Sequence, residues 1–124
     1  MRIAFKNQPL PFHNNAQVAA EAGLAAQEQG KFWEMHDKMF ANQGALERPS
    51  LERYAQELQL DMNKFKSALD SCKFKERISR ESKEGSTAGV SGTPTFFVNG
   101  YKLVGAQPVD AFKKLIDQEL AKKK

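Results

Sequence analysis

Cysteine is almost absent from this sequence, which has one, Cys72, among 124 residues. A single thiol excludes an intrachain disulfide and a Cys-x-x-Cys redox pair. The two histidines, His13 and His36, lie far apart, and no carboxylates cluster at ligand spacing. Because structural zinc needs several cysteine or histidine ligands at short spacings, we expect no metal and no cofactor.

Long hydrophobic runs are missing as well. No apolar stretch approaches the roughly 20 residues that cross a bilayer, and the first residues, Met1 to Lys6, are charged too early for a signal peptide. We therefore expect no membrane association. If the chain is complete, residence in the cytoplasm follows.

A strong excess of one charge is also lacking, since the formal net charge is only +4. The basic residues that could suggest nucleic-acid binding alternate with acidic ones: Lys73, Arg77 and Arg80 with Glu76, Glu81 and Glu84. This pattern is typical of a solvated helix face. We expect no nucleic-acid partner.

The composition, 40% hydrophobic and 27% charged, predicts one compact domain over residues 1–124. Ile3 to Phe5 reads as a short strand that ends before two prolines. The alanine-rich run from Ala16 to Gln29 predicts a helix, and Asn14 with Gln17 resembles a capping box.

A helical block is predicted over about residues 14–88. Within it, helical spacing of large apolar side chains places Trp33 and its neighbours in the core, and a second stripe runs from Leu51 to Leu58. Asp61 is the expected N-cap of the next helix. On that helix, Cys72 falls on the same face as Phe65 and other apolar residues, which predicts a half-buried thiol.

The pattern changes near residue 93, where a hairpin and a last helix are predicted over about residues 93–121. Thr95–Val98 and Tyr101–Val104 flank Asn99-Gly100, the pair that a type I′ turn favours. The expected inward residues of the last helix are Val109, Phe112, Leu115, Ile116 and Leu120. Pattern alone gives an α/β or α+β class.

The string Gly92-Thr93-Pro94-Thr95-Phe96-Phe97-Val98-Asn99-Gly100 resembles the cis-proline loop and hairpin of DsbA-type thioredoxin-fold disulfide oxidoreductases. Further similarity lies in residues 5–13, 31–37 and 104–108, so that the resemblance covers nearly the whole chain. It implies a truncated thioredoxin-like α/β fold, with an all-helical insertion between the first strand and the C-terminal hairpin plus helix.

The difference from the family pattern lies at the N-terminus. Family members carry a strand and a Cys-x-x-Cys helix ahead of the segment that begins here at Met1. That strand is central, between those corresponding to Ile3–Lys6 and Thr95–Val98, and its loss leaves backbone groups unpaired. The flanking strands could close up, another polypeptide could fill the gap, or a second copy could. We favour the last, which predicts a homo-oligomer or strand-swapped dimer.

The resemblance assigns peptide binding to Thr93 and Pro94, because the family's cis-proline loop pairs with extended polypeptide through its backbone. The alternative is a loop that only starts a strand. The resemblance assigns no catalytic cysteine to this chain, because the family's redox cysteines lie ahead of the matching segment. Cys72 is a weak candidate for a monothiol, because cations such as Lys73 and Arg77 lower a thiol pKa, but an inert core cysteine is the commoner case. His13 and His36 are expected to be structural.

Three functions remain open. The leading hypothesis is a DsbA-like protein without its own dithiol site, non-catalytic, with polypeptide binding or self-assembly. The enzyme alternative is a fragment of an active disulfide oxidoreductase whose Cys-x-x-Cys segment lies upstream or on another chain, which implies an exported or periplasmic location. The third is a scaffold dimer without a client.

Overall fold

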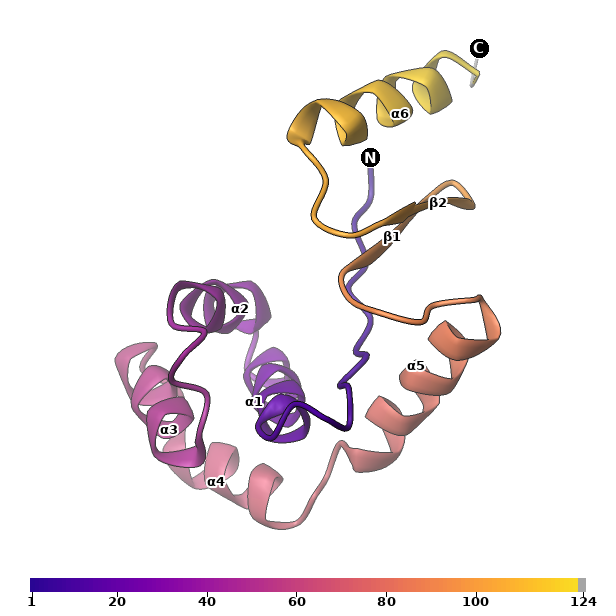
Figure 1. The fold of residues 1–124 in the computed structure, drawn as a ribbon. Coiled ribbons are helices and arrows are strands. Elements are labelled where there is room, and N and C mark those ends of the chain that lie inside the picture. The colour runs from indigo at the N-terminus through magenta and orange to yellow at the C-terminus, as the bar shows by residue number, and fades with distance from the viewer. Residues whose placement is uncertain (123–124) are drawn as a thin grey trace. The chain divides into compact units, whose positions relative to one another are not determined.

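The computed structural model describes residues 1–122 and shows two compact units, Met1–Gly85 and a second that begins at Ser86 (Figure 1). The helices are α1 (Ala16–Glu28), α2 (Phe32–Ala41), α3 (Arg48–Glu57), α4 (Met62–Asp70), α5 (Lys75–Thr87) and α6 (Val109–Ala121). The strands are β1 (Thr95–Val98) and β2 (Tyr101–Val104).

Helix α1 is the centre of the first unit and packs against α2, α3 and α4. Its small alanines let these helices approach closely, and Ala22, Ala25 and Ala26 are buried. The largest fully buried side chains in this core are Phe65 and Met35, both with no exposed surface. The predicted helical block and its stripe from Leu51 to Leu58 are confirmed.

Two predicted helix caps have different outcomes. Asp61 is the N-cap of α4, and its carboxylate accepts a hydrogen bond of 3.1 Å from the backbone N–H of Lys64, as predicted. The capping box at Asn14 is wrong, because the N-cap of α1 is Asn15, whose side chain makes no capping bond. Asn14 belongs instead to a turn in which Ala16 N–H donates to the carbonyl of His13.

The predicted strand at Ile3–Phe5 is also wrong, since the described structure has no strand before β1. A strand needs a neighbour to receive its backbone bonds. The segment is fixed at Asn7, whose backbone N–H donates to a side chain, the Glu81 carboxylate, at 2.9 Å. Ile3 is 69% exposed.

The second unit contains the predicted hairpin. β1 and β2 pair antiparallel, with Val98 opposite Tyr101 beside the turn. Asn99 and Gly100 have φ of 49° and 89°, the positive values that this turn requires. The mixture of helices with a small antiparallel sheet fits the truncated thioredoxin-like α/β class.

Helix α6 packs on β1, and the Phe112 ring meets Phe96 edge-on at 4.7 Å between centroids. Leu115 and Ile116 are half-buried. The prediction that Val109 and Leu120 face inward is wrong, because they are 79% and 52% exposed. Of the five residues expected to face inward, Phe112, Leu115 and Ile116 are the partly buried ones.

Candidate polypeptide-binding loop

The loop that enters β1 presents Thr93 and Pro94 at the surface of the second unit. Both residues are exposed, and the peptide bond between them is cis. Two hydrogen bonds hold the loop: the Thr95 hydroxyl donates to the carbonyl of Gly92 at 2.7 Å, and Gly105 N–H donates to the carbonyl of Pro94 at 2.8 Å. The loop is therefore fixed on both sides of the two candidate residues.

The backbone of Thr93 is unpaired. Within residues 1–122, no group donates to its carbonyl and its N–H finds no acceptor. Thr93 precedes β1, whose only strand neighbour in the described sheet is β2. An exposed, unpaired backbone beside an open strand edge can receive an extended polypeptide by adding a strand.

Cys72 belongs to the first unit, in the turn between α4 and α5, and not to the loop's unit. The prediction of a half-buried thiol on an apolar stripe is wrong, because Cys72 is exposed. Helix α4 ends at Asp70, and Cys72 has a φ of 53°, so that the helical spacing from Phe65 no longer applies. The structure shows a solvent-facing thiol, with no second cysteine in the chain.

The prediction that Trp33 is a core residue is also wrong. Its side chain is 47% exposed and joins Phe5, Phe32, His36 and Phe40 in an aromatic cluster on the first unit. His36 lies within this cluster, 4.6 Å from the Phe40 ring. The helical spacing within α2 suggested most of these contacts, but the contribution of Phe5 depends on tertiary structure.

The first unit also contains a buried polar network that was not predicted from the sequence. Glu81 is 5% exposed and accepts hydrogen bonds from the backbone N–H and the side-chain amide of Asn7, both at 2.9 Å. The Arg77 guanidinium adds a bond of 3.1 Å. Burial acts to raise the pKa of Glu81, but the bonds from Asn7 and Arg77 outweigh it and lower that pKa below its ordinary value. Only the i, i+4 spacing of Arg77 and Glu81 signalled this network in the sequence.

The predicted basic row is not a free cationic surface. Arg77 also donates to the Gln27 side chain at 3.0 Å, and Lys73 pairs with Glu28. Arg80 is exposed, but no aromatic side chain stands beside it in the sequence. This arrangement gives no support to a nucleic-acid interface.

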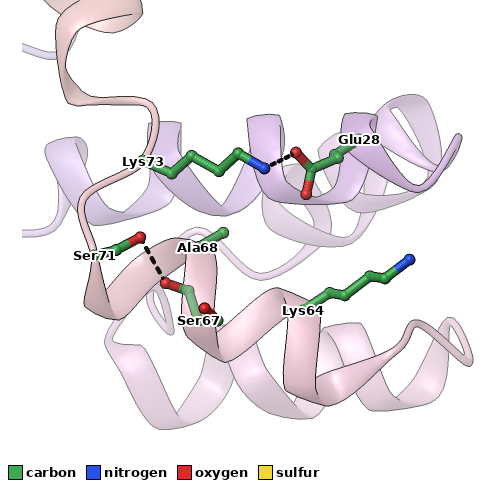
Figure 2. A pocket seen from close by; sticks show the side chains of 6 residues that line it. All are labelled: Glu28, Lys64, Ser67, Ala68, Ser71 and Lys73. Carbon is green, nitrogen blue, oxygen red and sulfur yellow. Dashed lines mark hydrogen bonds and ion pairs between the residues drawn. The ribbon is translucent and has the colours of Figure 1, made fainter.

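A small pocket of about 130 Å³ lies over α4 and the chain that follows it (Figure 2). Figure 2 shows Lys73 directed at the Glu28 carboxylate, while the Ser71 hydroxyl donates to the carbonyl of Ser67 at 2.8 Å. Lys73 and Glu28 thus neutralise each other, and the Ser71 hydroxyl is satisfied by the backbone. The pocket also lies at the C-terminal end of α4, where the helix dipole disfavours an anion.

No set of three or more potential metal ligands gathers anywhere in residues 1–122. None of the helices over the same range has both the length and the hydropathy to cross a membrane. Within the described residues, no hydrogen bond or ion pair joins His13 or His36 to Cys72, and His36 pairs with Asp37. His13 instead contacts the Phe12 ring at 4.6 Å.

Comparison with solved structures supports the fold. The chain superimposes with a TM-score of 0.83 on a thioredoxin-like oxidoreductase from Silicibacter pomeroyi, at 22% identity over 94% of this chain and 66% of that one. It superimposes with a TM-score of 0.82 on the thiol-disulfide exchange protein alpha-DsbA2 from Wolbachia pipientis, at 21% identity over 93% and 63% of the two chains.

Similar sequences occur within proteins named Na(+)/H(+) antiporter NhaA. Identity is 40% over 98% of this chain with NhaA 1 of Salinispora arenicola and 44% over 78% of it with NhaA of Herminiimonas arsenicoxydans. The chain spans less than a fifth of either protein, 19% and 16%. The family model of the DSBA-like thioredoxin domain matches residues 1–117. The chain therefore belongs to the family of DSBA-like thioredoxin domains.

Proposed function

We propose that this chain binds extended polypeptide at the loop formed by Thr93 and Pro94 and does not itself catalyse disulfide exchange. The observation that carries the proposal is the unpaired backbone of Thr93, held at the surface beside the open edge of β1. Binding through backbone groups suits an unfolded client of varied sequence, because every residue offers the same N–H and C=O.

The cysteine content supports the second part of the proposal, that the chain does not catalyse disulfide exchange. Dithiol exchange requires an attacking and a resolving thiol, and this chain contains one cysteine. Cys72 lies in the turn between α4 and α5, and no second cysteine is present to resolve a mixed disulfide. Insulin reduction by the wild-type chain that disappears on Cys72→Ser would contradict this half.

A pair of substitutions at Thr93 tests the binding half. Thr93→Pro removes the free N–H, whereas Thr93→Ala keeps it and removes only the side chain. Because one hydrogen bond contributes about 1–1.5 kcal/mol and 1.4 kcal/mol corresponds to tenfold, we expect Thr93→Pro to weaken binding about tenfold and Thr93→Ala to leave it nearly unchanged.

The probe is a fluorescein-labelled, alkylated insulin B chain, and fluorescence anisotropy gives its Kd. Circular dichroism of both variants establishes that each is folded. Failure of the wild-type chain to bind the probe, or equal weakening by the two substitutions, would refute a role for the Thr93 backbone.

The enzyme alternative is that a Cys-x-x-Cys segment outside this chain completes an active oxidoreductase. It is supported by the solved oxidoreductases, about a third of whose length lies outside the match. DNA sequence upstream of the Met1 codon distinguishes the two functions. An open reading frame that continues upstream through Cys-x-x-Cys favours the enzyme, and a ribosome-binding site at Met1 favours the stand-alone protein.

A further inference from the structure

A lysine of the hairpin holds the segment that leads from α5 into the loop at Thr93 and Pro94. The Nζ of Lys102, on β2, donates a hydrogen bond of 2.7 Å to the backbone carbonyl of Gly89. Both partners belong to the second unit. The contact therefore joins the hairpin to the chain that enters it.

Gly89 has a backbone conformation that takes its carbonyl out of the helical direction. Helix α5 ends at Thr87, and Gly89 N–H still donates to the carbonyl of Ser86 at 3.1 Å. Its φ of 90° is the left-handed conformation in which glycine commonly ends a helix. The Gly89 carbonyl therefore has no place in the helical pattern and accepts its bond from the hairpin instead.

The register of the hairpin determines the face from which Lys102 reaches Gly89. Lys102 lies directly opposite Phe97, so the two side chains share a face of the sheet. Phe97 follows Phe96, and successive residues of a strand point to opposite faces. Because Phe96 meets Phe112 of α6, Lys102 lies on the face away from that contact and is free to hold the incoming segment.

Three carbonyls between Gly89 and Pro94 accept hydrogen bonds from the hairpin or from the residue that follows it. The bonds run from Lys102 to Gly89, from the Thr95 hydroxyl to Gly92 and from Gly105 N–H to Pro94. Within residues 1–122, the two residues between the first pair of these carbonyls, 90 and 91, make no hydrogen bond of their own. Loss of the bond at Gly89 would therefore release this part of the segment.

We propose that Lys102 is a positioning residue for polypeptide binding, because its bond to Gly89 keeps the approach to Thr93 in the conformation that receives the client. The inference rests on the proposed function and adds a residue that acts on the same site without touching the polypeptide. A loop that is ordered before binding loses less conformational entropy when the client arrives. Lys102 thus increases affinity through order in the loop.

Three variants test the effect on affinity. Lys102→Met keeps the aliphatic length and removes the donor, and we expect it to raise the Kd of the labelled, alkylated insulin B chain about threefold, since an exposed bond of this kind is weak. Lys102→Arg retains an N–H donor and should restore binding to within about 1.5-fold of the wild-type chain. Lys113→Met removes the same charge from an exposed position on α6 and should leave the Kd unchanged.

The order of the loop is measured in the free chain, without polypeptide. Backbone amide relaxation, followed by nuclear magnetic resonance, gives order parameters for Val90, Ser91 and Gly92. We expect values near 0.85, typical of a rigid backbone, in the wild-type chain and in Lys113→Met, and a fall toward about 0.6 in Lys102→Met. Circular dichroism establishes that each variant is folded.

The outcomes separate this inference from the function on which it rests. Failure of the wild-type chain to bind the probe would refute polypeptide binding and the role of Lys102 in it. Binding by the wild-type chain with an unchanged Kd in Lys102→Met would overturn the role of Lys102 alone, whether or not the loop loosens. Equal weakening by Lys102→Met and Lys113→Met would also overturn it, because general charge attraction would then explain the effect.

Discussion

The buried Glu81 carboxylate provides the sharpest stability prediction. Glu81→Gln keeps the shape of the side chain but removes the charge that three hydrogen bonds from Asn7 and Arg77 stabilise. Hydrogen bonds to charged groups contribute about 1.5–3 kcal/mol each, and the glutamine retains part of them. We expect the free energy of unfolding at pH 7 to fall by about 2–3 kcal/mol.

The pH dependence of stability provides a second, independent test of this prediction. The pKa of Glu81 is lowered in the folded chain from its ordinary value of 4.5. Its contribution is therefore fully present above about pH 4.5 and is lost as the pH falls through the lower folded-state pKa. The difference between the wild-type chain and Glu81→Gln should be constant at neutral pH and shrink in acid.

Urea unfolding followed by circular dichroism, at pH 7 and at several pH values below 4.5, measures both effects. Glu84→Gln is the matched control, because Glu84 lies on the same helix, is 54% exposed in its side chain and makes only a 3.6 Å pair with Lys6. That exposed pair should contribute less than about 1 kcal/mol. An equal loss for the two variants, or a Glu81→Gln loss independent of pH, would refute the reasoning.

Two further predictions concern the core and the hairpin. Phe65→Ala removes a side chain with no exposed surface and should lower the free energy of unfolding by about 3–5 kcal/mol in urea, whereas a loss under 1 kcal/mol would mean that the site collapses around the gap. Gly100→Ala places a Cβ at a φ of 89° and should cost about 1–2 kcal/mol, although no neighbouring atom obstructs it, and unchanged thermal unfolding would contradict strain at this turn.

The parts of the fold that local sequence determines were predictable. The turn at Asn99-Gly100 and the cap at Asp61 depend on residues within four positions, and both are confirmed. The prediction of a strand at Ile3 failed because a strand forms only beside another strand that receives its hydrogen bonds. The prediction that Cys72 is half-buried failed because the apolar pattern continues past Asp70, whereas the helix ends there.

The candidate loop was identified by its resemblance to a family, not by spacing or composition. Exposure and hydrogen bonding then supplied what the motif could not, namely that the backbone of Thr93 is unpaired in the described structure. The network of Asn7 and Glu81 joins residues 74 positions apart, and no pattern in one sequence reveals such a contact.

Nuclear magnetic resonance of the chain, with and without alkylated insulin B chain, tests the binding claim most directly. We predict that the amide signal of Thr93 shifts on addition of the polypeptide. The amide of Phe96 should shift less, because Phe96 lies two residues from the hydrogen-bonded Val98–Tyr101 pair and so faces β2. Shifts confined to the aromatic cluster around Trp33, with Thr93 unaffected, would contradict binding at Thr93 and place the binding site on the first unit.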